Sequence, residues 1–125
     1  MATTRELGEA TESLACEYLK SKGLKLVERN FNCRFGEIDL IMQNSDSLIF
    51  VEVRYRRNKD FGSGAESITM SKQSKLIKTA SAYLQRHAKL SKYPARFDVV
   101  SITGPIETKS INNIDFDWIE NAFGA

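Results

Sequence analysis

Hydrophobic residues recur at the spacing of an α-helix in two stretches of the chain. The first stretch predicts a helix over residues 4–22, which Gly23 is placed to end. Its apolar stripe consists of Leu7, Leu14, Ala15, Tyr18 and Leu19. The second stretch predicts a helix over residues 71–90. Its stripe consists of Leu76, Ile77, Ala80, Tyr83, Leu84 and His87. Each helix is therefore expected to bury one face.

Shorter apolar runs, several of them alternating with polar residues, predict strands. They cover residues 24–29, 37–42, 48–55, 96–103 and 115–119. The polar segment 43–47 predicts a hairpin between the second and third strands, whereas residues 30–36 are expected to be irregular and residues 58–67 to form a loop. The helix between the third and fourth strands permits a parallel crossover. The pattern predicts an α/β fold, with a mixed sheet and helices in the order αβββαββ.

Composition places this pattern in one ordinary globular unit. The chain has 125 residues, of which 42% are hydrophobic and 27% charged, and we expect a single domain over residues 1–125. A disordered tail, a fibre and a membrane-spanning protein are excluded as classes. Eighteen basic against 16 acidic residues leave a formal charge of +2, which does not by itself indicate a nucleic-acid partner. The positions of the charges therefore matter more than their sum.

Two cysteines and the start of the chain bear on localisation. Cys16 and Cys33 lack the nearby Cys or His residues that a zinc site needs, and we expect both thiols to be reduced. The first residues contain no apolar core of a signal peptide. The cytoplasm is the expected compartment, with no membrane association.

Acidic residues interrupt the two most apolar strands. If residues 37–42 alternate, Glu37 and Asp39 share one face, and Ile38 and Leu40 share the other. The hairpin can then bring Asp39 beside Glu52 of the next strand. Like charges so placed repel each other unless something neutralises them. A divalent cation such as Mg²⁺, held by two carboxylates and water, would do so.

The adjacent arginines offer an alternative that needs no metal. Glu52, Arg54 and Arg56 share a strand face, and Arg57 follows directly. These cations could pair with the acids in a cross-strand salt-bridge cluster, because ion-pair networks also gather charges in this way. Spacing alone leaves both readings open.

The sequence also resembles a known family. Gly36-Glu37-Ile38-Asp39-Leu40-Ile41 and Phe50-Val51-Glu52-Val53-Arg54-Tyr55-Arg56 closely resemble strings of the YraN family of bacterial proteins. That family looks like a minimal member of the PD-(D/E)XK, or restriction-endonuclease-like, superfamily. The resemblance extends over most of the chain, in order, through Gly8, Glu12, Ala15, Tyr18, Leu19, Gly23, Arg29-Asn30, Phe61-Gly62, Lys72, Arg96-Phe97-Asp98-Val99-Val100 and Asn121-Ala122-Phe123.

This resemblance implies a restriction-endonuclease-like αβββαβ core and hydrolysis of a phosphodiester bond. Asp39, Glu52 and the Val53 carbonyl would hold Mg²⁺ or Mn²⁺, and Glu12 stands where similar Holliday-junction resolvases place a glutamate near the metal. The alternative for Glu12 is an ordinary glutamate at the edge of the apolar stripe. Glu37 is expected to support the ligands, to bind the metal itself or to pair with a cation.

Arg54 stands where the superfamily has a lysine, and with Asp39 and Glu52 it completes the catalytic set that the resemblance implies. Arginine stays protonated in proteins, so Arg54 cannot act as a general base. It can still bind phosphate through two hydrogen bonds and stabilise the charge that develops there.

Basic residues cluster directly after the proposed metal strand. We expect them to bind nucleic acid, although a solvated charged face is the usual alternative. They are Arg56, Arg57, Lys59, Lys72 and Lys75. Four aromatic residues nearby could stack on bases or fill the core. They are Phe31, Phe35, Tyr55 and Phe61.

Two polar residues of the second helix are expected to be structural. His87 is the only histidine and falls in the apolar stripe, where a bond to a backbone carbonyl is the simplest arrangement. Gln73 also points inward, and a satisfied buried amide is its simplest role, although it could approach the site.

The leading hypothesis is a magnesium-dependent nuclease that acts on DNA, with branched or structured DNA favoured by the resemblance to the resolvases. A non-catalytic nucleic-acid-binding module with the same fold is the alternative, because Arg54 replaces lysine. A protein-interaction domain whose acids and arginines only form salt bridges is a third. A homodimer would suit a junction-cutting enzyme, but the sequence indicates no interface for one.

Overall fold

The computed structural model describes residues 4–57, 68–105 and 114–124, and contains two helices and five strands in the order αβββαββ. Both the order and the mixed α/β class confirm the prediction from the pattern. The elements are α1 (Thr4–Ser21), β1 (Lys25–Cys33), β2 (Gly36–Gln43), β3 (Leu48–Arg56), α2 (Met70–Arg86), β4 (Ala95–Thr103) and β5 (Asp115–Phe123).

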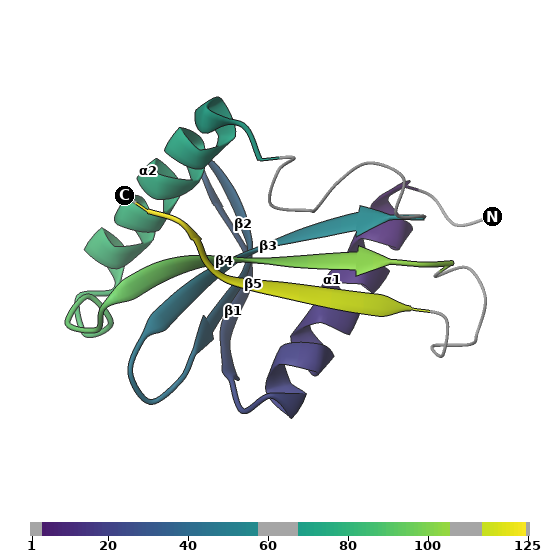
Figure 1. The fold of residues 1–125 in the computed structure, drawn as a ribbon. Helices are drawn as coiled ribbons and strands as arrows, with labels where there is room; N and C mark the ends of the chain where they lie inside the picture. The colour runs from purple at the N-terminus through teal and green to yellow at the C-terminus, as the bar shows by residue number, and fades with distance from the viewer. Residues whose placement is uncertain (1–3, 58–67, 106–113, 125) are drawn as a thin grey trace.

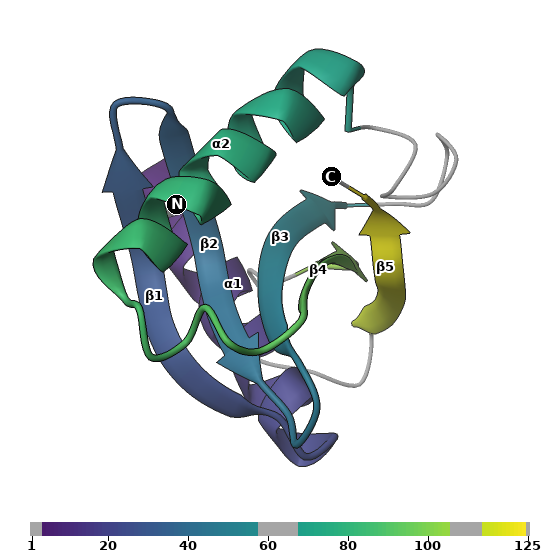
Figure 2. The same ribbon diagram turned by 90° about the vertical axis from the view of Figure 1, so that its left-hand side faces the viewer.

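The five strands form one mixed sheet in the order β1-β2-β3-β4-β5. Only β3 and β4 are parallel, joined by the α2 crossover, and the other three pairs are antiparallel. The helices cover opposite faces of the sheet, which gives three layers (Figure 1, Figure 2). This arrangement is compatible with an αβββαβ core. Neither helix in the described part of the chain is long and apolar enough to cross a membrane.

Each helix seals its own hydrophobic core. The core under α2 joins Leu76, Ala80 and Tyr83 to the strand residues Phe31, Ile38, Ile41, Leu48, Phe50, Phe97 and Val99. The core under α1 joins Ala15, Cys16 and Leu19 to Leu40, Met42, Ile49, Val51, Val100 and Ile102. Alternation along β3 therefore serves both cores, because successive residues of a strand point to opposite faces.

The first hairpin differs from the sequence prediction. The strand expected over 24–29 continues to Cys33, and residues expected to be irregular pair with β2 up to Cys33↔Gly36. Asn30 lies within this strand at φ 54, between the pairs Arg29↔Leu40 and Phe31↔Ile38. A left-handed residue bends a strand, and a short polar side chain such as asparagine tolerates that conformation.

This bend also overturns one expectation about β2. Ile38 and Leu40 do not share a face: Ile38 belongs to the core under α2, whereas Leu40 belongs to the core under α1. Simple alternation fails here because Asp39 lies opposite the kink at Asn30. The side chains on either side of Asp39 therefore enter different cores.

Two element ends also differ from the prediction. The second helix, expected to reach residue 90, ends at Arg86, because His87 leaves the helical conformation and residues 87–93 form successive turns. The last strand, expected over 115–119, continues to Phe123.

A buried carboxylate holds this longer last strand in place. Asp98 of β4 is fully buried and accepts hydrogen bonds from the Trp118 indole at 2.9 Å and the Asn121 backbone N–H at 2.9 Å. The Arg96 guanidinium donates two more, at 3.1 and 3.2 Å. Asn121 adopts φ 51 next to a register shift between Phe97 and Val99. The extension of β5 therefore depends on partners 20 or more positions away from Asp98.

Candidate functional site

The site begins where β2 and β3 separate. Their pairing runs from Gln43↔Leu48 to Leu40↔Val51. Beyond that point the Val53 N–H donates a hydrogen bond of 2.9 Å to Asp39 Oδ2 instead of to a β2 carbonyl. In a strand the N–H and C=O of one residue point to the same side, so the Val53 carbonyl also faces this opening. The predicted proximity of Asp39 to β3 is thus confirmed.

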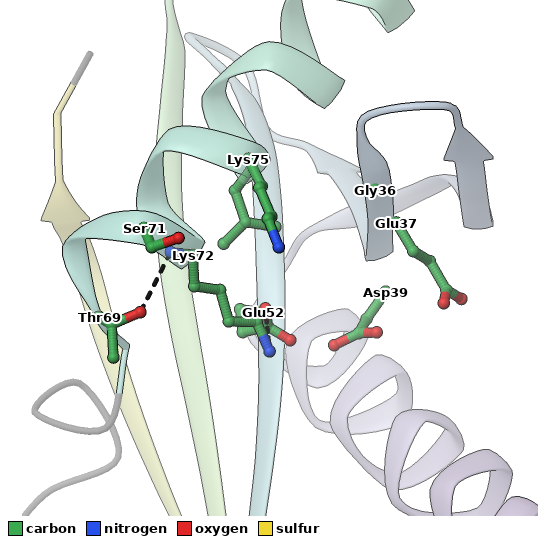
Figure 3. A pocket seen from close by; sticks show the side chains of 9 residues that line it. Gly36, Glu37, Asp39, Glu52, Thr69, Ser71, Lys72 and Lys75 are labelled. Carbon is green, nitrogen blue, oxygen red and sulfur yellow. Dashed lines mark hydrogen bonds and ion pairs between the residues drawn. The ribbon is translucent and has the colours of Figure 1, made fainter.

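Glu52 lies next to Asp39 with only 8% of its surface exposed. Burial raises the pKa of Glu52 to about 8, helped by a hydrogen bond with the Asp39 carboxyl and by its charge. Lys72 and Arg54 act in the opposite direction, and the Lys72 ammonium lies 3.4 Å from Glu52 Oε2. Figure 3 shows the two carboxyl groups facing each other, with Lys72 reaching down from α2.

Glu12 of α1 reaches toward the same cluster, as the resemblance implied. Its side chain is 17% exposed and lies 3.9 Å from the Arg29 guanidinium. Burial raises the pKa of Glu12 to about 7, and the charge of Asp39 adds to the rise. A hydrogen bond from the Asn30 side chain lowers it in part. Glu12 is thus partly buried at the edge of the apolar stripe and lies close enough to Asp39 to feel its charge.

The carboxylates line two adjoining hollows. The first, of about 430 Å³, lies between the β1–β2 turn and the start of α2, and its wall is formed by Gly36, Glu37, Asp39, Glu52, Thr69, Ser71, Lys72, Lys75 and Leu76 (Figure 3). The second, of about 310 Å³, lies on the α1 side and is bounded by Thr4, Leu7, Gly8, Thr11, Glu12, Asp39, Glu52, Val53, Arg54, Tyr55 and Lys72. Asp39, Glu52 and Lys72 belong to both, so they are reachable from either side.

The local sequence explains how the first turn of α2 positions Lys72. Thr69 caps the helix, and its hydroxyl accepts a hydrogen bond of 3.1 Å from the Lys72 backbone N–H. This cap fixes the first turn of α2. Lys72 then projects from that turn toward Glu52 (Figure 3).

The predicted basic residues are distributed unevenly around the hollows. Lys72, Lys75 and Arg54 line them. Arg56 and Arg57 lie at the end of β3, outside the residues that line either hollow. The predicted Lys59 lies outside the described residues, as do Phe61 and the loop expected over residues 58–67.

Glu37 lies at the margin of the site. It lines the first hollow but is exposed, and in Figure 3 its carboxylate extends away from Glu52. Within residues 4–57, 68–105 and 114–124, no three His, Cys, Asp or Glu side chains are arranged to enclose one metal ion. Any ion at this site would rely on Asp39 and Glu52, with water completing its coordination.

Gln73 of α2 and His87, directly after the end of α2, have the structural roles expected of them. His87 Nδ1 lies 2.9 Å from the Tyr83 carbonyl oxygen, and the two rings stack with centroids 4.0 Å apart. The Gln73 amide donates to the Ile68 carbonyl at 3.1 Å. Both thiols, Cys16 and Cys33, are free.

Sequence reasoning missed two features of the site. Asn30 supports Glu12, yet it appeared only as part of a family motif, and its left-handed conformation is the kind that asparagine tolerates. Lys72 was expected on a basic rim but forms an ion pair with Glu52. A cation in the first turn of a helix, where the helix dipole disfavours it, is the signal that could have singled it out.

Comparison with known proteins identifies the family of this chain. The model of the "Uncharacterised protein family UPF0102" matches residues 11–102, a range that includes Glu12, Asp39, Glu52 and Lys72. A UPF0102 protein of Stutzerimonas stutzeri is 47% identical over 123 residues, which is 98% of each chain. One from Nitrosococcus oceani is 51% identical over 122 residues, covering 98% of this chain and 94% of the relative. One from Legionella pneumophila is 50% identical over 122 residues, again 98% of each. The chain therefore belongs to the uncharacterised protein family UPF0102, the family that the strand motifs indicated.

Proposed function

We propose that this protein is a metal-dependent nuclease of the restriction-endonuclease-like type that hydrolyses phosphodiester bonds in DNA. The observation that carries the proposal is the pairing of Asp39 and Glu52 at the opening between β2 and β3, beside the Lys72 ammonium. The resemblance of these strands to the PD-(D/E)XK motif supports it, as does the αβββαβ order of the core.

The two carboxyl groups fit Mg²⁺ or Mn²⁺. Mg²⁺ is usually bound through one or two carboxylates and keeps several waters, so a site of only Asp39 and Glu52, with the Val53 carbonyl on the same side, is sufficient. Burial raises the pKa of Glu52 to about 8, and the neighbouring Asp39 carboxyl adds to the rise, so the site favours a bound cation that would offset both effects. The chemistry that the ion supplies, when bound, is polarisation of a phosphate oxygen and a lower pKa of bound water.

The chain's own cations would act on the phosphate. The Arg54 Nε is buried and has no hydrogen-bond partner among the described residues, and Arg54 lines the hollow on the α1 side. Its guanidinium can donate two hydrogen bonds to phosphate oxygens and hold the scissile group. Lys72 lies at the other side of Glu52 and contributes a second positive charge. Both would stabilise the charge that develops on the phosphate during hydrolysis.

The positive charges around the acids also support a polyanionic substrate. Lys75 lines the first hollow, and Arg56 and Arg57 follow in the chain at the end of β3. Each phosphate contact made by such residues releases a counterion, so binding should weaken steeply as salt rises.

A cleavage screen tests the proposal. Linear, flapped and four-way DNA are incubated with the protein in Mg²⁺ or Mn²⁺, beside the Asp39→Asn and Glu52→Gln variants and the matched control Asp117→Asn, an exposed acid on β5. We expect cleavage by the wild type and by Asp117→Asn, and a loss of at least about 100-fold in the two site variants, since such a loss is typical when charge stabilisation is removed. Equal product from all four proteins would point to a contaminating nuclease and refute the proposal.

The replacement of lysine by Arg54 favours a second function, a non-catalytic nucleic-acid-binding module. In that case DNA would bind with the same affinity with or without metal, and Asp39→Asn would leave binding intact. The same four proteins, in a binding assay with and without EDTA, separate the two functions.

A further inference from the structure

The β1–β2 turn carries an aromatic side chain that the proposed chemistry does not use. Arg34 and Phe35 form the tip between Cys33 and Gly36. Among the described residues, the large hydrophobic side chains that are exposed are Phe35, at 37%, and Met70, at 78%. Phe35 therefore adds little to the core, although a phenylalanine at a turn tip is costly to hydrate.

The surroundings of the Phe35 ring suit a nucleobase. The Arg34 guanidinium lies over the Phe35 ring, 4.8 Å from the centroid, and places a positive charge at the tip. Gly36, the next residue, lines the first hollow together with Glu37 and Asp39. Phe35 and Asp39 are four positions apart in the chain, so their Cα atoms are separated by at most about 14 Å, the span of a fully extended chain. The tip and the carboxylates are thus close enough to touch one nucleic-acid strand.

Gly36 allows the β1–β2 turn to lie close to α2. A Cβ at Gly36, which has φ 152, would lie 3.2 Å from Thr79 Oγ1 and 3.9 Å from the Lys75 Cβ. The glycine lets the hairpin approach α2 closely, and this close contact sets where the tip stands beside the first hollow.

The other aromatic candidates for base stacking do not fit. Phe31 is 7% exposed and packs edge-on against Tyr83 in the core under α2. Tyr55 donates its hydroxyl proton to the Gly104 carbonyl. Phe61 lies outside the described residues. Tyr55 lines the second hollow but is half-buried and packs against the core under α1. Phe35 is therefore the most exposed of the described candidates.

We propose that Phe35, with Arg34, stacks on an unpaired base of a nucleic acid whose backbone lies in the first hollow. Every base has a flat face, so such stacking tolerates sequence. Bases inside a duplex already stack on one another, whereas single strands and branch points offer a free face. The substrate class is therefore DNA with unpaired bases next to the bond to be cut. This inference rests on the proposed function for the position of the backbone.

The test measures equilibrium binding of a fluorescent single-stranded oligonucleotide and of a blunt duplex in EDTA, so that no cleavage interferes. Removing one stacking partner costs about tenfold in affinity. We expect Phe35→Ala to bind the single strand about tenfold more weakly and the duplex less than twofold more weakly. Phe35→Trp should retain binding of the single strand. Met70→Ala, which removes the other exposed apolar side chain, is the matched control and should bind both as the wild type does.

Three outcomes would overturn the inference: equal affinity of Phe35→Ala and wild type, an equal loss on both DNAs, or a wild type that does not bind the single strand. Light scattering adds a fourth, because a change from dimer to monomer in Phe35→Ala would assign the ring to self-association. Failure of this inference can be distinguished from failure of the nuclease proposal. Duplex cleavage that depends on Asp39 would survive loss of the stacking role, and Phe35-dependent binding would survive absence of cleavage.

Discussion

Two buried carboxylates lie on the neighbouring strands β3 and β4, one register position apart, in opposite surroundings. Asp98 is fully buried and receives hydrogen bonds from Arg96, Trp118 and the Asn121 backbone. Glu52 is nearly as buried, but its neighbours are a second carboxyl group, Asp39, and one lysine at 3.4 Å. The first acid is satisfied and holds two strands together. The second is crowded by like charge and faces a hollow.

The contrast shows how a buried acid that is satisfied within the fold differs from one that can accept a ligand. A buried carboxylate supplied with donors stabilises its surroundings, whereas one kept beside another acid raises its pKa and favours binding of a proton or a cation. Burial alone does not distinguish Asp98 from Glu52. The partners do.

The largest effect expected from this comparison is the loss of the structural acid. Asp98→Asn removes the charge that pairs with Arg96, and breaking such a pair costs about 3 kcal/mol in the free energy of unfolding. Urea denaturation should show this loss, with Asp117→Asn, an exposed acid on the same strand pair, unchanged as the control. A loss below about 1 kcal/mol would mean that Asp98 does not hold β5 as described.

The corresponding substitution at Glu52, the acid of the proposed site, should change stability in the opposite direction. The folded pKa of Glu52, about 8, lies above its ordinary 4.5, so its contribution is fully present below pH 4.5 and is lost as pH rises through 8. Glu52→Gln removes this dependence. In EDTA, we expect its unfolding free energy relative to wild type to rise between pH 5 and pH 8 by on the order of 2 kcal/mol. Chemical denaturation at several pH values measures it.

In the Glu52→Gln variant the unfolding free energy should still fall with pH, but less steeply, because the pKa of Glu12 is itself raised to about 7. A wild-type stability that does not fall between pH 5 and pH 8 would show that the two acids are not crowded in solution. Asp98→Asn serves as the reference here, because its loss of stability should appear at both pH values.

A third prediction adds the cation that the crowded acids are proposed to bind. At ten times its dissociation constant, Mg²⁺ or Mn²⁺ should stabilise the wild type by about 1.4 kcal/mol at pH 8. Less stabilisation is expected at pH 5, because metal ligands must be deprotonated. Thermal unfolding reports the shift. Asp39→Asn should abolish it and Asp98→Asn should not; a shift that survives in Asp39→Asn would place the ion elsewhere.

The smallest expected effect concerns the hairpin that positions Asp39. Gly36→Ala places a Cβ against Thr79 at φ 152, which should cost about 1 kcal/mol of stability. We expect the metal-induced shift at pH 8 to shrink in this variant, since the hairpin must move away from α2. Gly23→Ala, also at positive φ but with open space around the Cβ, is the matched control and should lose stability without losing the metal response.

Much of the fold followed from local patterns. Helical spacing located α1 and α2, alternation located β2, β3 and β4 closely, and the polar turn predicted the β2–β3 hairpin that brings Asp39 to β3. These features are readable because each depends on residues a few positions apart. The bend at Asn30 was not readable, because a single left-handed residue leaves no periodic trace and changes which core Ile38 and Leu40 join.

The amino-acid sequence by itself determined that acids interrupt two adjacent apolar strands and that cations follow them. Tertiary structure alone decided which distant groups surround each buried acid. Lys72 reaches Glu52 because the α2 crossover places the start of that helix beside β3. Arg96 is a near neighbour of Asp98 on β4, but Trp118 and Asn121 reach Asp98 only through the pairing of β4 with β5. Charges 20 positions apart carry no sign of their distance in the fold. Whether a buried acid is satisfied or left open to a ligand is therefore a property of packing.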